Sequence, residues 1–214
     1  MSDVLRHRGP DSRGAFCDSE QAFAVAHRRL SVLDLSEAGH QPMADPSGRY
    51  VIAYNGDIYN HQDLRSELYP PTPWRGDSDT ETLLAAIVQW GVAGALERVR
   101  GMFALALWDR ERHELTLARD RIGEKPLYYG WSKGTFLFAS ELSAIEAFPG
   151  FDRTLSRQAL AELFRLAYVP APLSIYDALP SPSSCGQGDV LSRPSGPGAR
   201  GCFISPASAA WAGQ

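Results

Sequence analysis

Met102–Ala118 reads MFALALWDRERHELTLA, and this stretch decides the fold. Both of its ends are apolar or alternating runs of the kind that forms strands, and the charged segment Asp109–His113 separates them. Five residues are too few for a helical crossover, so the two runs are expected to pair as an antiparallel hairpin. The sequence therefore predicts a sheet built with tight antiparallel connections.

Strand signals continue on both sides of this hairpin. Gln21–Ala26, Tyr50–Tyr54 and Thr135–Ala139 are short apolar or alternating runs bounded by Gly, Pro, Asp or Asn. Several of them are separated by connections too short for a helix. We therefore expect them to belong to antiparallel sheets.

Two helices have clear start signals. Ser78 followed three residues later by Glu81 is a capping box, which predicts a helix from about Asp79 to Gln89. Ser156 is the expected N-cap of a second helix, with leucines placed before and after it as in a hydrophobic staple. Helices that flank antiparallel strands predict an α+β domain in which the helices cover packed sheets.

The last stretch of the chain has a different composition. Of the 34 residues from Ser181 to Gln214, 17 are Ser, Pro or Gly, and no strand or helix period persists. We expect a disordered tail there. Two of the three cysteines, Cys185 and Cys202, fall in it, which is unusual for a solvated linker, so a frameshifted gene end is the alternative.

Composition and charge exclude several function classes. The net charge of -4 and the pI near 5.7 give no basic field, and no run of basic residues is longer than Arg28–Arg29, so nucleic acid is not an expected partner. The longest apolar run, Met102–Trp108, is far short of the roughly 20 residues that span a bilayer, and the start has no apolar signal segment. A cytoplasmic protein without a membrane partner is expected.

Cofactor signals are equally weak. The cysteines form no CxxC pair, the five histidines are scattered, and no Gly-rich lysine loop for nucleotide phosphates is present. We therefore expect neither a metal nor a cofactor site in this chain.

The segment Tyr54–Asp57 supports two interpretations. Asn-Gly beside apolar alternation is a strong signal for a type I′ turn. Alternatively, the Asn55 side-chain amide and the Gly56 backbone N–H are two donors that could stabilise an oxyanion. The two interpretations are compatible, since a tight turn would aim both donors at one point.

Two charged positions also have a structural and a functional interpretation. Arg29 follows a strand, where its guanidinium is either solvated or able to grip a small carboxylate through two parallel hydrogen bonds. Asp79 opens a helix, where its carboxylate either complements the positive helix end or receives a substrate ammonium group. Taken singly, neither position decides between the two.

Five segments occur together and in one order, and this changes the interpretation. They read RHRGPD at 6–11, RLSVLD at 29–34, YNGDIYNH at 54–61, SDTE at 78–81 and RDRIGEKPLYY at 119–129. The set resembles the class II glutamine amidotransferase domain of glutamine-hydrolysing asparagine synthetases, and the likeness covers roughly residues 1–176.

The resemblance implies a fold and a division of the chain. The fold would be a four-layer αββα sandwich of antiparallel sheets, of the N-terminal-nucleophile hydrolase type, here missing its first strand. Residues 1–152 would be the amidotransferase domain, 153–180 a linker helix and the start of the synthetase domain, and 181–214 the tail.

The resemblance also implies site residues. Arg29 would bind the α-carboxylate of L-glutamine and Asp79 its α-amino group. Asn55 and Gly56 would form the oxyanion hole, and Asp57 would take a substrate-contacting position where the family more usually has Glu. ATP and magnesium would act in the synthetase domain of the intact family, whose members can form homodimers.

One departure from the family concerns the nucleophile. Family members attack glutamine with an N-terminal cysteine whose own amine serves as the base, but this chain starts Met1-Ser2. Cys17 has no such amine and is expected to be a small residue within a strand. We therefore expect the 214-residue chain to be inactive as a glutaminase. A related amidotransferase with another acceptor and a non-catalytic glutamine-binding module are the alternatives.

Overall fold

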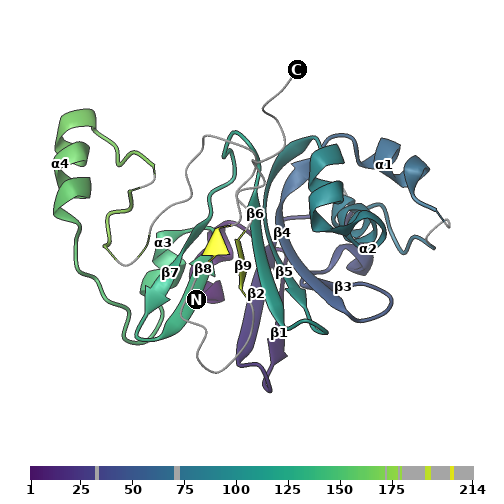
Figure 1. The fold of residues 1–214 in the computed structure, drawn as a ribbon, viewed down its shortest axis with the longest axis horizontal. Helices are drawn as coiled ribbons and strands as arrows, with labels where there is room; N and C mark the ends of the chain where they lie inside the picture. Colours follow the sequence, from purple (N-terminus) through teal and green to yellow (C-terminus); the bar gives the residue numbers. More distant parts are fainter. Residues whose placement is uncertain are drawn as a thin grey trace.

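The computed structural model describes residues 1–31, 34–69, 73–171, 173–177 and 179, and the backbone of two short strands, β9 (Leu191–Arg193) and β10 (Phe203–Ile204). The rest of the expected tail lies outside the described residues. Figure 1 shows a twisted central sheet with helices against one face and two small sheets on the other side.

The central sheet contains the predicted hairpin. It is built from β3 (Met43–Ala44), β4 (Tyr50–Ile58), β5 (Gly101–Asp109) and β6 (Glu114–Arg119), with β9 and β10 added at the β6 edge. All of its pairs are antiparallel. In the hairpin Trp108 pairs with Leu115, so the prediction from Met102–Ala118 is confirmed.

Two two-stranded sheets lie on one side of the central sheet (Figure 1). One pairs β1 (Ser12–Asp18) with β2 (Phe23–Arg29), and the other pairs β7 (Tyr128–Ser132) with β8 (Thr135–Ala139). The prediction for β8 is confirmed. The strand expected at Gln21–Ala26 begins two residues later, because Ala22 has a positive φ of 50° in the turn, and it continues to Arg29.

Helices α1 (His61–Glu67) and α2 (Asp79–Arg98) cover the opposite face of the central sheet (Figure 1). The Ser78 N-cap is confirmed, because its side chain accepts a hydrogen bond from the Thr80 N–H. The predicted helix end near Gln89 is confirmed for the first helical segment of α2. Gly91 interrupts the helix with a φ of 73°, and the chain then resumes a helical path to Arg98. No helix in the described ranges has the length and apolar character needed to cross a membrane.

The remaining helical elements are short. They are the 3₁₀ helices η1 (Ser2–His7) and η2 (Glu37–Gly39) and the α-helices α3 (Leu142–Glu146) and α4 (Arg157–Leu166). The predicted N-cap of α4 is confirmed, since the Ser156 hydroxyl accepts from the Ala159 N–H. In Figure 1, α4 stands apart from the layered body, whereas α3 lies beside β7 and β8.

The apolar core fills both faces of the central sheet. One cluster joins β4 and β5 to α2 and includes Ile52, Ile58, Leu83, Ile87 and Leu105. The other joins the central sheet to the two small sheets and includes Val51, Ala106, Trp108, Leu117 and Tyr129. Each large apolar side chain buried in this way stabilises the fold by about 1.5–3 kcal/mol. The result is the α+β layering of helices and antiparallel sheets that the sequence predicts.

A third cluster crosses the expected domain boundary at residue 152. Leu179 is fully buried against Leu137, Ile145 and Phe151, and Tyr176 packs edge-on against the Phe151 ring. Tyr176 and Leu179 are therefore part of the same packed body as β8 and α3. The position of the boundary stays a prediction.

Candidate functional site

The second half of β4 has a neighbouring strand on only one side among the described strands. β3 reaches only as far as Val51 and Ile52 on β4, so the edge away from β5 is open from residue 53 onward. Two backbone amides on this open edge bond to side chains instead. The Tyr54 N–H donates to Gln41 Oε1 at 2.7 Å, and the Ile58 N–H donates to Asp79 Oδ2 at 3.0 Å.

Gly56 lies midway between these two residues, and its N–H points to the same open edge. In an antiparallel ladder, alternate residues direct their N–H groups to the same side. Phe103, which is opposite Gly56, uses both of its backbone groups on Asp120: its N–H donates to Oδ2 at 3.2 Å, and its carbonyl accepts from the Asp120 N–H at 2.8 Å. Gly56 therefore keeps a donor that β5 does not use.

The type I′ turn considered for Asn55 and Gly56 is wrong. Both residues lie inside β4, paired with Ala104 and Phe103. Glycine is needed at position 56 because a Cβ there would lie 2.3 Å from the Met102 carbonyl oxygen. The Asn-Gly signal thus marks a close approach of two strands rather than a reversal of the chain.

Asp79 places a buried carboxylate beside this edge. It is the first residue of α2, only 6% exposed, and its Oδ2 accepts hydrogen bonds from the Tyr54 hydroxyl at 2.9 Å and from the Ile58 N–H. Burial raises the pKa of Asp79, and the nearby Asp57 charge raises it further, although the two hydrogen bonds oppose the shift. A cation placed next to Asp79 would stabilise its ionised form and so offset the effects of burial and of the Asp57 charge.

Arg29 ends β2, and its guanidinium is held by the loop that follows. Nη1 donates to the Ser36 carbonyl at 2.8 Å, and Nη2 donates to the Asp34 carbonyl. A Cβ on Gly39 would lie 2.2 Å from Nη2, so the loop closes tightly around the guanidinium. Each terminal nitrogen of an arginine carries two hydrogens, so this arrangement leaves donors for a carboxylate.

His27 precedes Arg29 by two residues on β2, and the sequence assigned it no role. Its Nε2 lies 3.0 Å from the Tyr54 carbonyl oxygen, so Nε2 carries the proton and Nδ1 is an acceptor. Burial lowers the pKa of His27 to about 4, and the Arg29 and His40 charges act in the same direction. Nδ1 is buried without a hydrogen-bond partner among the described residues. Side chains alternate along a strand, so residues 27 and 29 share one face. This alternation is the sequence signal that could have indicated His27 as a neighbour of Arg29.

Asn55 faces away from Tyr54, because side chains alternate along a strand. It lines, together with His27, a cavity of about 320 Å³ between β2, β4, β5 and β8. Cys17 of β1 also reaches this cavity, whose other walls are mostly apolar. Asn55 is exposed, and its side-chain amide has a hydrogen-bond donor to offer.

The predicted residues lie on contacting elements, namely β2, β4 and the start of α2. The Gly56 N–H and Asp79 lie along the edge, Asn55 lies on the cavity side beside His27, and Arg29 follows on β2. Asp57 is near enough for its charge to affect Asp79. Sequence reasoning missed Gln41, which bridges the Tyr54 N–H and the Thr80 hydroxyl and which no motif indicated.

No three His, Cys, Asp or Glu side chains converge as metal ligands in the described ranges. The site therefore presents hydrogen-bond donors, one guanidinium and carboxylates. These are the groups that recognise the two charged ends and the amide of a small amino acid.

Comparison with known sequences identifies related proteins. The chain is 40% identical over 169 residues to asparagine synthetase (glutamine-hydrolyzing) 3 of Bacillus subtilis, a match that covers 78% of this chain and 27% of that relative. It is 34% identical over 194 residues to putative asparagine synthetase (glutamine-hydrolyzing) 2 of Methanocaldococcus jannaschii, covering 82% of this chain and 37% of the relative. The chain thus spans well under half the length of these curated relatives.

A solved structure supports the fold. Glutamine phosphoribosylpyrophosphate amidotransferase from B. subtilis superposes with a TM-score of 0.61 and 19% identity, over 88% of this chain and 46% of that one. The family model described as a glutamine amidotransferase domain matches residues 1–183. Because this match takes in strands β3–β6 of the central sheet, both small sheets and the site at the open edge of β4, the chain belongs to the glutamine amidotransferase domain family.

Proposed function

We propose that this chain is the glutamine-binding half of a glutamine-hydrolysing asparagine synthetase. The observation that carries the proposal is the Gly56 N–H on the open edge of β4, which has no partner among the described residues and lies next to the buried carboxylate of Asp79. The high identity to the two relatives named as asparagine synthetases supports the choice of acceptor reaction.

In the proposed complex, each part of glutamine meets a group of matching chemistry. The α-ammonium group binds Asp79, whose raised pKa reflects a carboxylate that gains from a nearby cation. The α-carboxylate binds the guanidinium of Arg29. Asp57, on the same stretch of β4, contacts the substrate from the side of Asn55.

The side-chain amide of glutamine is placed by the remaining two donors. Its carbonyl oxygen accepts from the Gly56 N–H and the Asn55 Nδ2. When a thiolate attacks the amide carbon, negative charge develops on that oxygen, and fixed donors stabilise the charge. Removing one donor of this kind lowers rates by about 100- to 1000-fold in well-studied hydrolases.

The proposal gives these residues neither the nucleophile nor the amidation of the acceptor. Cys17 lies within β1 and has no free α-amine, so a polypeptide of these 214 residues is proposed to bind glutamine without hydrolysing it. The amidation of aspartate, with its ATP and magnesium, is proposed to take place in the part of the longer relatives that this chain does not cover.

A binding titration tests the proposal. L-glutamine added to the 214-residue chain should bind saturably, as measured by calorimetry or NMR, and D-glutamine should bind at least about tenfold more weakly. Asp79→Asn and Arg29→Met should each weaken L-glutamine binding by about tenfold or more. Asp63→Asn, an exposed change on α1, is the control and should leave binding unchanged. Equal affinity in all four proteins would overturn the assignment.

A further inference from the structure

We propose that Asp34 is a positioning residue that ties Arg29 to the turn carrying Asp79, and so fixes the separation of the two charged groups that hold an amino acid. This inference rests on the proposed function. It adds a residue that need not touch glutamine. The evidence is a chain of hydrogen bonds from the end of β2 to the start of α2.

The first half of this chain lies within the loop after β2. The Arg29 guanidinium donates to the backbone carbonyls of Asp34 and Ser36. The Asp34 carboxylate in turn accepts from the Ser36 N–H through Oδ1, at 2.7 Å. The guanidinium and the Asp34 carboxylate therefore hold the same loop segment from two sides.

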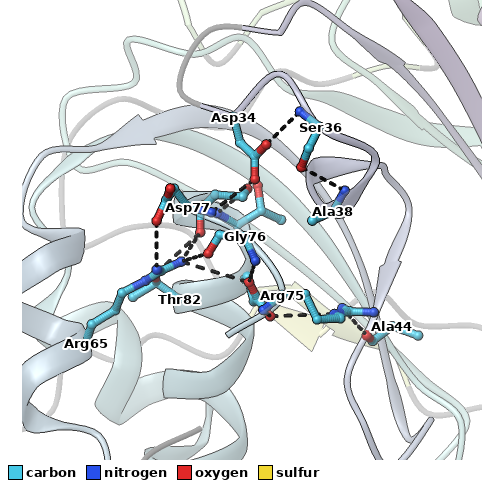
Figure 2. Close-up of polar contacts among 12 residues, drawn as sticks. Asp34, Ser36, Ala38, Ala44, Arg65, Arg75, Gly76, Asp77 and Thr82 are labelled. Atoms are coloured by element: carbon cyan, nitrogen blue, oxygen red, sulfur yellow. Dashed lines mark hydrogen bonds and ion pairs between the residues drawn. The ribbon is translucent and has the colours of Figure 1, made fainter. Parts of the chain in front are cut away.

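The second half of the chain reaches across to the turn before α2. Asp34 Oδ2 accepts from the Asp77 N–H at 3.0 Å, two residues before Asp79 (Figure 2). The approach is close, since a Cβ on Gly76 would lie 2.2 Å from Asp34 Oδ2. Hydrogen bonding to the Ser36 side chain is the largest cause that holds the pKa of Asp34 below its usual range, and the bonds from the Ser36 and Asp77 N–H groups act in the same direction, so the carboxylate is ionised and both oxygens can accept.

The turn at 75–78 is itself firmly held, as Figure 2 shows. Arg65 of α1 donates to the carbonyls of Gly76 at 2.9 Å and Ser78 at 3.1 Å, and its guanidinium lies over the Trp74 ring. The buried Glu81 carboxylate accepts from the N–H groups of Arg75 and Gly76 at 2.9 and 3.1 Å. The turn is thus a fixed support, and Asp34 attaches the arginine loop to it.

This geometry has a consequence for ligand recognition. An α-amino acid carries its ammonium and carboxylate groups on one carbon, so both groups can be held at once only if their partners keep the matching separation. Asp34 should therefore matter most for ligands that have both groups. A ligand with only one of them can follow its partner wherever it moves.

The experiment compares three ligands on the 214-residue chain by NMR titration. They are L-glutamine, 4-carbamoylbutanoate, which lacks the α-ammonium group, and 4-aminobutanamide, which lacks the α-carboxylate. Asp34→Ala should weaken L-glutamine binding about tenfold and each truncated ligand less than about threefold. Glu37→Gln is the matched control, because Glu37 lies exposed on the same loop without a side-chain partner in the described structure, and it should change none of the three affinities.

An equal loss for all three ligands would overturn the inference, because it would mean general damage to the site. An unchanged L-glutamine affinity would do the same. If the wild-type chain binds none of the ligands, the proposed function fails. Amide hydrogen exchange then tests separately whether Asp34 links the loop after β2 to the turn before α2. In that case Asp34→Ala should accelerate exchange at both Ser36 and Asp77, and a change at only one of them would contradict the link.

Discussion

His27 shows how burial sets the charge of a single side chain beside the open edge of β4. Its Nε2–H is used by the Tyr54 carbonyl, and its pKa is lowered to about 4, mainly by burial. The ring is therefore neutral at physiological pH. A neutral ring next to Arg29 avoids repulsion between two neighbouring positive charges.

This shift predicts how stability depends on pH. An unfolded histidine has a pKa near 6.5, so between about pH 6.5 and 4 the unfolded state binds a proton that the folded state does not. The free energy of unfolding should therefore be highest above pH 6.5 and fall by about 3 kcal/mol as the pH is lowered to 4. Urea denaturation of wild type and His27→Gln measures this, and the variant should lack that part of the pH dependence. His7→Gln, at an exposed position, should retain the wild-type slope; an identical slope in His27→Gln would contradict the prediction.

Single residues were predicted unevenly from the sequence. Arg29, Asn55, Gly56 and Asp79 came from motif resemblance, and their roles stay predictions. His27 and Gln41 were missed, because their importance comes from backbone groups of β4 that a sequence does not display. A side chain that bonds to the backbone of a distant strand leaves no local pattern.

Among the elements, the loop after β6 depends on one carboxylate. Asp120 accepts hydrogen bonds from four consecutive N–H groups, at residues 122–125, and from Phe103 of β5. Burial alone would raise the pKa of Asp120, but these backbone N–H groups reverse the effect and hold it below the usual value. Asp120 thereby joins the loop to the strand that faces Gly56.

We predict that Asp120→Asn destabilises the fold by about 3 kcal/mol. The substituted amide can accept at only one of its two heavy atoms, and its NH₂ group would face backbone N–H groups. The measurement is the free energy of unfolding in urea. Asp63→Asn, which changes an exposed carboxylate on α1, should shift stability by less than about 0.5 kcal/mol. A loss at Asp120 no larger than this control would show that the loop does not need the charge.

Element type was easier to predict than element extent. The 102–118 hairpin, β8 and the N-caps of α2 and α4 follow from local periodicity and capping chemistry. The Asn-Gly turn was wrong because the contact with Met102 across the ladder overrides a local turn preference. The end of the first segment of α2 was predicted, whereas the second segment after Gly91, in which Ala95 and Leu96 pack into the core, was not.

At the scale of the whole molecule, the packed body extends past the predicted boundary at residue 152. Leu179 is fully buried with Ile145 and Phe151, while α4, between them in sequence, leaves Phe164 86% exposed. The segment after α4 thus returns to the body. The layered α+β fold could be predicted from the strand patterns and the helix caps. The packing of Leu179 against the body could not, because a single buried leucine forms no periodic pattern in the sequence.

A pair of shortened chains tests this packing. A polypeptide of residues 1–152 should be less stable than one of residues 1–180 by at least about 3 kcal/mol, since it loses the buried Leu179 side chain and the Tyr176 ring. Urea unfolding of both gives the difference. Leu179→Ala in the longer chain should cost about 2–5 kcal/mol and serves as the point-variant check. Matching midpoints for the two lengths would contradict the prediction.

The open edge of β4 also bears on solubility. A bare strand edge invites pairing with other molecules, which leads to aggregation. Of the three successive N–H groups on this edge, at residues 54, 56 and 58, the first and the last already donate to Gln41 and Asp79. A strand from another molecule could therefore hydrogen-bond to only one of the three. A small ligand that needs only the Gly56 N–H is not excluded in this way. Gln41 and Asp79 thus also protect this edge from pairing with the strand of another molecule.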